Sequence, residues 1–339
     1  MSLFKSIYYN CSSAFPLAFL KRLYPSTCLL PYHHIVSDED VWHIKHLYNY
    51  KNVSQFKNDL EILLKNFKPI SASDLIQYIQ TNNQLPKNTF LLSFDDGFRE
   101  VNDVIAPLLE AKGVPAIFFI NPAFIDNKKL FYRGKTSLLI HELLKNKKKP
   151  TMIHEIGDIL NTQKHTIEVF IGMLKKLNNT DEALVNDLAQ KLSLSFDEYL
   201  VRQKPFLTTE QLTSLDKRGF TIGAHSWSHP YYDKISFEDQ LEETISSCNF
   251  VKEKTKQHSI TFSFPYSDNA VSQNLFDALH KTEIDLMFGI QNQKVELNNN
   301  MVHRFNAERP GISLDKQLKG IMLFMAIQKK MGKQTVLRK

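Results

Sequence analysis

Strand-like and helix-like segments alternate along most of the chain, and this alternation constrains the fold more than any other feature. The apolar runs 88–94 and 114–120 have the length of buried strands, and residues 99–113 between them carry a helical pattern that ends at Gly113. Residues 54–67 likewise place their apolar side chains at helical spacing. The pattern predicts an α/β fold with a parallel sheet of about seven or eight strands, enough to close a barrel.

The alternation stops between residues 124 and 205, where the sequence is polar and helical, with candidate helices at 135–146, 165–177 and 181–192. A stretch of this length is too long for an ordinary α/β connection, so we interpret it as an inserted helical subdomain. Alternation resumes with a helix capped by Thr208 and Gln211. The predicted organisation is an N-terminal segment (1–29), a first barrel part (30–123), the insertion (124–205), a second barrel part (206–312), and a C-terminal helix with a basic tail (313–339).

Composition narrows the class of protein. A chain with 42% hydrophobic and 23% charged residues is an ordinary globular protein, which excludes disordered and fibrous classes. The net charge of +6 is mild for 339 residues, and much of the excess lies in "KNKKK" (145–149) and in the C-terminal tail. We interpret the lysine run as a solvated loop, although it could face an acidic glycan, and we expect no nucleic-acid partner.

The cysteines and the N-terminus bear on the cellular compartment. Cys11, Cys28 and Cys248 have no CxxC spacing, which argues against a disulfide framework and favours a reducing compartment. The first residues are mildly apolar but interrupted by polar side chains and Pro16, so we expect no signal peptide. No apolar run reaches the roughly 18 residues of a transmembrane segment. We therefore expect a cytoplasmic protein, with association at the cell envelope as the alternative.

Two carboxylates follow the strand at 88–94 directly, in "SFDDG". Asp95 and Asp96 would repel one another at the end of a buried strand unless a cation lies between them or one is protonated. The simple alternative is an Asp-Gly turn.

A histidine pair follows another predicted strand, in "GAHSWSHP". His225 and His229 are four residues apart, so a helical turn would bring both imidazoles to one face, where they could bind one metal ion. Two histidines and one carboxylate make a catalytic site with open positions, and the second aspartate is then free to act as a general base. A chance pair of near-core histidines is the alternative.

The motifs together resemble a known family. "SFDDG", "HSWSH" and "FSFPY", in this order, resemble the first three motifs of the polysaccharide deacetylases, the NodB-homology family of carbohydrate esterases (family 4). "PYHHIVSDE" is similar to the lead-in of the subgroup with an N-terminal YHxx strand, and the likeness covers about 30–125 and 205–310. The resemblance implies a distorted (β/α)7 barrel, here with the helical insertion. It also implies one divalent ion, usually zinc and sometimes nickel or cobalt, with Asp95 as the catalytic base and Asp96, His225 and His229 as metal ligands.

The third motif departs from the commonest family pattern. Many members carry an arginine where this chain has Ser263, and that arginine orients the base. "SFPY" resembles the form without arginine, in which the backbone N–H of Tyr266 would stabilise an oxyanion. Arg304 in "VHRFNAER" is our candidate for the missing cation, and a surface ion pair is its alternative role.

The proton donor is less well defined by the sequence. The late Leu-x-His motif of the family is not intact, although His303 lies in that region. The N-terminal YH strand resembles a permuted arrangement in which an early histidine takes this role, so we prefer His33. His34 is expected on the other face of the strand, and a core position is the alternative for either His33 or His303.

The resemblance implies hydrolysis of N-acetyl groups on an acetylated glycan or amino sugar. Three alternatives remain open at this point. They are an O-acetyl carbohydrate esterase, a non-catalytic carbohydrate-binding barrel, and an amidohydrolase that acts on a small amide other than a sugar.

Overall fold

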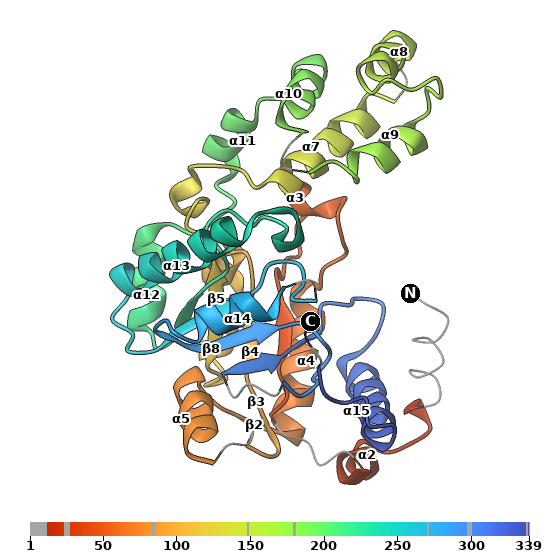
Figure 1. The fold of residues 1–339 in the computed structure, drawn as a ribbon. Coiled ribbons are helices and arrows are strands. Elements are labelled where there is room, and N and C mark those ends of the chain that lie inside the picture. Colours follow the sequence, from red (N-terminus) through yellow and green to blue (C-terminus); the bar gives the residue numbers. More distant parts are fainter. Residues whose placement is uncertain are drawn as a thin grey trace.

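The structure is a computed structural model that describes residues 12–23, 28–82, 86–147, 149–178, 181–269, 271–296, 300–336 and 338. Its centre is one parallel sheet of eight short strands (Figure 1). In spatial order these are β10 (Phe305–Asn306), β1 (Pro31–His33), β4 (Leu92–Phe94), β5 (Ala116–Ile120), β6 (Thr221–Ala224), β7 (Ile260–Ser263), β8 (Ile284–Gly289) and β9 (Met301–His303).

The two ends of this sheet belong to one segment of the chain. In β9, Met301 pairs with Met287 of β8, whereas Phe305 of β10 pairs with Pro31 of β1 on the other side. Only Arg304 separates the two strands, so the eight strands occupy seven positions and the sheet nearly closes on itself. The predicted (β/α)7 barrel is confirmed.

Apolar side chains from both faces of the strands explain why the barrel forms. All five residues of β5 are buried, as expected for a parallel strand that is covered on both faces. The surrounding helices are α4 (Val53–Asn66), α5 (Ala72–Asn82), η1 (Val101–Ile105) with α6 (Ala106–Glu110), α12 (Thr209–Lys217), α13 (Phe237–Lys254), α14 (Gln273–Leu279) and α15 (Leu314–Lys330). Helix α12 begins with the capping box between Thr208 and Gln211 that the sequence indicates.

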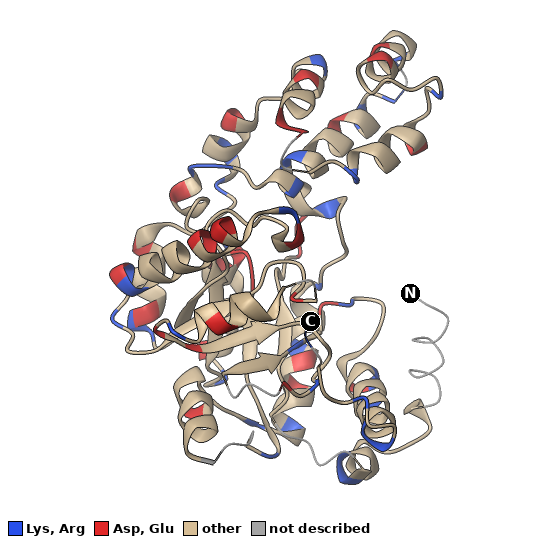
Figure 2. Ribbon diagram, viewed as in Figure 1, with Lys and Arg blue, Asp and Glu red and all other residues tan. Residues whose placement is uncertain are grey.

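The polar segment after β5 folds into helices that form a lobe at one end of the barrel (Figure 1). These are α7 (Tyr132–Lys145), α8 (Pro150–Ile159), α9 (Ile167–Leu174), α10 (Glu182–Lys191) and α11 (Phe196–Gln203). Leu139, Ile156, Phe170 and Leu188 belong to a hydrophobic cluster within this lobe. Acidic and basic residues are interspersed over its helices (Figure 2), and the described lysines of 145–149 are exposed.

A second hydrophobic cluster joins the lobe to the barrel. Phe98, after β4, stacks on Phe206 at 5.7 Å, and Leu138 of α7 belongs to the same cluster. The short helix α3 (Trp42–Lys45), which follows β1, packs against α7. The start of α7 therefore lies beside the loops at the carboxyl ends of the first strands, which is where α/β proteins carry their sites.

The N-terminal segment packs on the barrel where it is described. Helix α2 (Leu17–Leu23) lies against α15, and Lys21 Nζ lies 4.5 Å from the centre of the Phe67 ring. Cys28 and Cys248 are buried free thiols. Cys11 lies outside the described residues, as do all residues before it. Within the described ranges, no helix combines the length and the apolar character that crossing a bilayer requires.

Candidate active site

The Asp-Asp-Gly turn at the end of β4 has an unusual backbone. Asp96 has φ of +75° and Gly97 has φ of +64°, so two successive residues are left-handed. A Cβ on Gly97 would lie 3.1 Å from Ile120 Cγ2, which leaves little room for a larger residue. His229 and Tyr266 also have positive φ, at +59° and +54°. Left-handed non-glycine residues are costly and gather at functional sites, and three of the predicted site residues share this feature.

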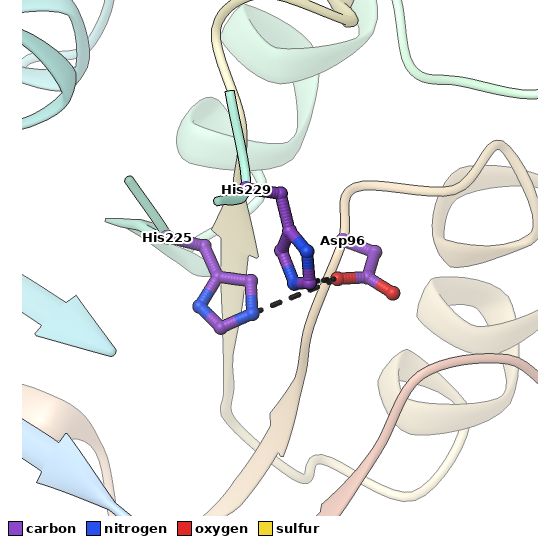
Figure 3. Close-up of side chains that lie close together, drawn as sticks. All are labelled: Asp96, His225 and His229. Atoms are coloured by element: carbon purple, nitrogen blue, oxygen red, sulfur yellow. Dashed lines mark ion pairs between the residues drawn. The ribbon is translucent and has the colours of Figure 1, made fainter. Parts of the chain in front are cut away.

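Asp96, His225 and His229 converge on one point (Figure 3). Asp96 Oδ1 lies 3.6 Å from His225 Nε2 and 3.3 Å from His229 Nε2, and one ligand atom from each residue lies within 4.8 Å of the others. Figure 3 shows both imidazoles turned toward the Asp96 carboxylate, with a dashed line from each to it. The structure thus brings together the three residues for which the sequence predicts metal ligation.

The hydrogen bonds around this cluster fit a metal ion. His225 Nδ1 lies 2.8 Å from the carbonyl oxygen of Ser263; a carbonyl can only accept, so Nδ1 carries the proton and Nε2 has a free lone pair. Asp96 Oδ1 is buried without a hydrogen-bond partner among the described residues. Burial would raise the pKa of Asp96, but the nearby histidines outweigh it and the net shift is downward, so the carboxylate is ionised. Two imidazoles with a carboxylate oxygen make a donor set suited to zinc.

Asp95 is held by the arginine between β9 and β10. Arg304 Nη1 and Nη2 donate to its two carboxylate oxygens at 2.7 and 2.8 Å. Arg304 is fully buried, and its guanidinium lies 4.8 Å from the centre of the Tyr32 ring. Burial would raise the pKa of Asp95, yet Arg304 and the nearby His225 lower it below its ordinary value. The structure places Arg304 in the position for which the sequence proposes it, beside the base, and not in a surface ion pair.

Ser263, which stands where the third motif commonly has an arginine, contacts both Arg304 and His225. Its hydroxyl accepts a hydrogen bond from Arg304 Nη2, and its carbonyl accepts the Nδ1 proton of His225. Arg304 therefore reaches Ser263, at the end of β7, from the residue between β9 and β10. Tyr266, three residues further on, places its ring 4.4 Å from that of His229 and lines the same cleft.

His33 does not reach this site, which contradicts its assignment as the proton donor. It is buried between the Phe56 and Phe94 rings, at 5.4 and 5.6 Å, and neither ring nitrogen has a partner among the described residues. Burial lowers its pKa well below the ordinary value, so it is neutral. The strand β1 ends at His33, and the chain then turns, so the alternation expected for His34 does not apply.

His34 lines the cleft instead. Its Nδ1 lies 2.7 Å from Glu308 Oε2, and the second oxygen of Glu308 accepts the backbone N–H of Ile35 at 2.8 Å. Burial lowers the pKa of His34, but Glu308 outweighs it and raises the pKa to about 9. Glu308 therefore favours the protonated form of His34, and within the described chain no hydrogen bond occupies its Nε2, which can serve a ligand. The sequence reasoning excluded it on a strand geometry that the chain does not have.

His303, the other predicted candidate for the proton donor, lies in a separate buried cluster. Its Nε2 is 3.0 Å from Glu296 Oε2, and Arg338 donates to both Glu296 and Asp268, at 2.7 and 3.0 Å. These contacts hold the C-terminal tail against the loop after β7. The cluster does not line the cleft, so His303 is not placed to protonate a ligand there.

The cleft that contains these residues has a volume of about 320 Å³. The sequence does not single out Glu308 and Arg133, which line the cleft, or Asn121, which supports it, and it places His34 on the wrong face. Asn121, directly after β5, donates from Nδ2 to the carbonyl oxygens of His225 and Ser226 and so fixes the histidine loop. Glu308 lies two residues after the end of β10, and this position near a strand end is a signal that the sequence offers. Arg133 lies in the insertion, where no motif marks it.

Comparisons with known proteins agree with this fold. Among solved structures, the chain is similar to a Streptococcus pyogenes deacetylase, PplD, in complex with acetate (13% identity, 87% of this chain and 98% of that one, TM-score 0.56). It is also similar to IcaB from Ammonifex degensii (14% identity, 87% and 96%, TM-score 0.53). A third is a de-N-acetylase from Aggregatibacter actinomycetemcomitans (14% identity, 86% and 100%, TM-score 0.53).

At identities this low, the solved structures establish only the fold of the chain. Its family is established by a match to a protein-family model. No curated protein sequence matches the chain. The family model described as polysaccharide deacetylase matches residues 82–287, which is more than half of the chain and spans all three motifs. The chain therefore belongs to the polysaccharide deacetylase family.

Proposed function

We propose that this protein is a metal-dependent deacetylase that hydrolyses N-acetyl groups on a glycan or an amino sugar. The observation that carries the proposal is the meeting, in one cleft, of three side chains that could bind a metal ion and a second carboxylate held by a buried arginine. Family membership supports hydrolysis of an acetyl group, and the name of the de-N-acetylase among the structural neighbours supports an N-acetyl substrate.

Asp96, His225 and His229 would hold the ion, and zinc, nickel or cobalt are the candidates. A divalent ion bound there would polarise the acetyl carbonyl and lower the pKa of a water molecule from about 15.7 toward 7. The free Nε2 of His225 and the unpartnered Oδ1 of Asp96 support this ligand set.

Asp95 would accept the proton of the attacking water. A carboxylate offers about four lone-pair sites, so the two hydrogen bonds from Arg304 leave sites for the water proton. Arg304 fixes the orientation of the carboxylate, which is the role of a positioning residue. The Tyr266 backbone N–H would donate to the acetyl oxygen as negative charge develops on it.

His34 would protonate the leaving nitrogen. An amine is a poor leaving group unless it receives a proton, and the His34–Glu308 pair supplies a cationic donor at neutral pH. A proton transferred from His34 Nε2 to the leaving nitrogen would let the C–N bond break with release of an amine. Glu308 stabilises the imidazolium before this transfer. This arrangement favours amide over ester hydrolysis, since an alkoxide leaves with less assistance.

A matched pair of substrates tests the proposal. We would measure acetate release by the zinc-loaded protein from N-acetylated and O-acetylated forms of the same oligosaccharide, with Asp95→Asn as the control. The proposal predicts release from the N-acetyl form by the wild type and not by Asp95→Asn. Faster release from the O-acetyl form would instead identify a carbohydrate esterase, and binding of both forms without release would identify a carbohydrate-binding barrel.

A further inference from the structure

The helical lobe contributes directly to the wall of the active-site cleft. Phe131 and Arg133, at the beginning of α7, line the cleft together with the metal-binding triad. Arg133 Nη1 donates to the Tyr231 hydroxyl at 2.9 Å. The Tyr231 ring stacks on the Tyr266 ring at 3.8 Å, and Tyr266 contacts His229. Two aromatic rings therefore connect Arg133 to a proposed metal ligand, which places the guanidinium close to the reacting centre.

The charges of the cleft are matched except at Arg133. Asp95 is paired with Arg304, and Glu308 is paired with His34. Asp96 faces the two histidines that share the metal site. Arg133 forms no ion pair within 4.0 Å with any carboxylate of the described chain, and its one hydrogen bond to Tyr231 leaves four of its five N–H donors for a ligand.

A hydroxyl group in the same cleft also lacks a partner. Tyr48, in the loop after α3, lines the cleft, and its buried hydroxyl has no hydrogen-bond partner in the described chain. Its ring lies 5.1 Å from that of His34. Burial, followed by the charges of Glu308, Asp96 and Asp95, raises the pKa of Tyr48 well above its ordinary value, so the hydroxyl keeps its proton and can donate it. Buried polar groups without partners are uncommon in folded proteins, and this one lines a cleft that a ligand can enter.

We infer that the glycan accepted by this cleft carries an anionic group beside its acetamido group, and that Arg133 and Tyr48 bind this anion. This inference rests on the proposed function and adds the substrate class. An arginine fork matches the geometry of a carboxylate or a phosphate, so a uronic acid and a sugar phosphate are the two sources of this chemistry. The lobe then serves as a specificity element, because it carries the arginine while the barrel carries the catalytic groups.

The test compares substrates that differ in charge. We would measure kcat/KM for acetate release from neutral N-acetylglucosamine oligosaccharides, from oligosaccharides in which N-acetylglucosamine alternates with glucuronate, and from N-acetylglucosamine 6-phosphate. We expect one of the two anionic substrates to exceed the neutral one by about 10- to 100-fold, the effect of a hydrogen-bonded charge pair. Which of them is preferred distinguishes a carboxylate from a phosphate.

Variants assign the preference to Arg133. Arg133→Gln should reduce the ratio of anionic to neutral kcat/KM by about 10-fold or more, and Arg133→Lys should keep part of this ratio. Tyr48→Phe, added to Arg133→Gln, should reduce the ratio further. Lys145→Gln removes a positive charge from the exposed end of the same helix and should leave the ratio unchanged. An unchanged ratio in Arg133→Gln, or equal rates for all three wild-type substrates, would overturn the inference.

A binding measurement separates this inference from the proposed function. Calorimetry on zinc-loaded Asp95→Asn compares the dissociation constants of the neutral and anionic oligosaccharides without turnover. Tighter binding of an anionic one, lost when Arg133→Gln is added, supports the inference even if no acetate is released from any substrate. Equal binding of both forms overturns it, even if acetate release confirms a deacetylase.

Discussion

Arg304 and Asp95 lie 209 residues apart in the sequence and form a fully buried, two-point ion pair, with both nitrogen–oxygen distances below 3 Å. Arg304 lies between the two strands that close the barrel. The same guanidinium bonds the hydroxyls of Ser93 and Ser263, so it connects three strands at the catalytic end. Closure of the barrel and orientation of the base therefore depend on one side chain.

Replacement of Arg304 should impair turnover even when charge is kept. Arg304→Lys retains the positive charge but loses the planar fork, so we expect kcat to fall about 10- to 100-fold while bound metal is retained. Arg218→Lys is the control, because Arg218 also makes a two-point contact with a carboxylate, that of Glu110, but on the surface. Steady-state kinetics with metal analysis check this prediction. Near-native kcat in Arg304→Lys would show that Asp95 does not need the arginine fork.

Asp95 should respond differently from the three proposed metal ligands, Asp96, His225 and His229, when metal content is measured. His225→Ala removes a ligand nitrogen, so we expect bound zinc to fall below stoichiometric levels after dialysis. Asp95→Asn leaves the triad intact and should keep zinc while losing turnover. Elemental analysis of the dialysed proteins gives the metal content directly. Retention of zinc by His225→Ala, or turnover by Asp95→Asn near that of the wild type, would contradict the assigned roles.

The His34–Glu308 pair predicts the alkaline limit of activity. Glu308 raises the pKa of His34 to about 9 against the effect of burial, so the donating imidazolium is present below that pH and is lost above it. The raised pKa also affects stability, because the folded protein holds the His34 proton more tightly than the unfolded chain does. The ion pair therefore adds to the free energy of unfolding in full below the ordinary histidine pKa of about 6.5, and this contribution is lost as the pH rises through about 9.

Glu308→Gln should move that limit to lower pH, because burial then lowers the pKa of His34 with less opposition. The pH dependence of kcat for the wild type and Glu308→Gln, measured between pH 6 and pH 10, tests the shift. If the alkaline limb stays near 9 in Glu308→Gln, a group other than His34 donates the proton.

His33 offers the converse prediction. Its ring nitrogens have no partners and its side chain is packed between Phe56 and Phe94, so His33→Leu should keep kcat within about twofold and should not lower stability in the way that loss of a hydrogen bond would. His34→Gln should reduce kcat by about 100-fold. Kinetics and thermal unfolding of both variants check this contrast. A large loss of kcat in His33→Leu, with an unchanged melting temperature, would restore His33 as the donor.

The barrel and the convergence of Asp96, His225 and His229 could be predicted because their signals are local. Asp95, Asp96, His225 and His229 each follow a recognisable apolar strand, and parallel strands bring their carboxyl ends to one edge. Arg304 was found because a missing arginine at Ser263 required a replacement. These conclusions depend on short motifs and strand order, which a single sequence displays.

The remaining site residues depend on geometry that a single sequence does not display. The sequence places His34 on the other face of the strand from His33, but β1 ends at His33, and strand ends are the least certain part of any pattern. Arg133 enters the cleft only because α7 packs against α3 and the loops after the first strands. No spacing or motif links position 133 to position 48, so their shared exposure to the cleft is visible only in the folded chain.

The most direct test of the account is the metal dependence of acetate release. Protein stripped with a chelator, the same protein reloaded with one equivalent of zinc, and zinc-loaded Asp95→Asn would be compared on an N-acetylated oligosaccharide. The account predicts release by the reloaded wild type alone, with the stripped protein and the variant at background. Equal acetate release before and after stripping would contradict the central role of Asp96, His225 and His229 as the site of a catalytic metal.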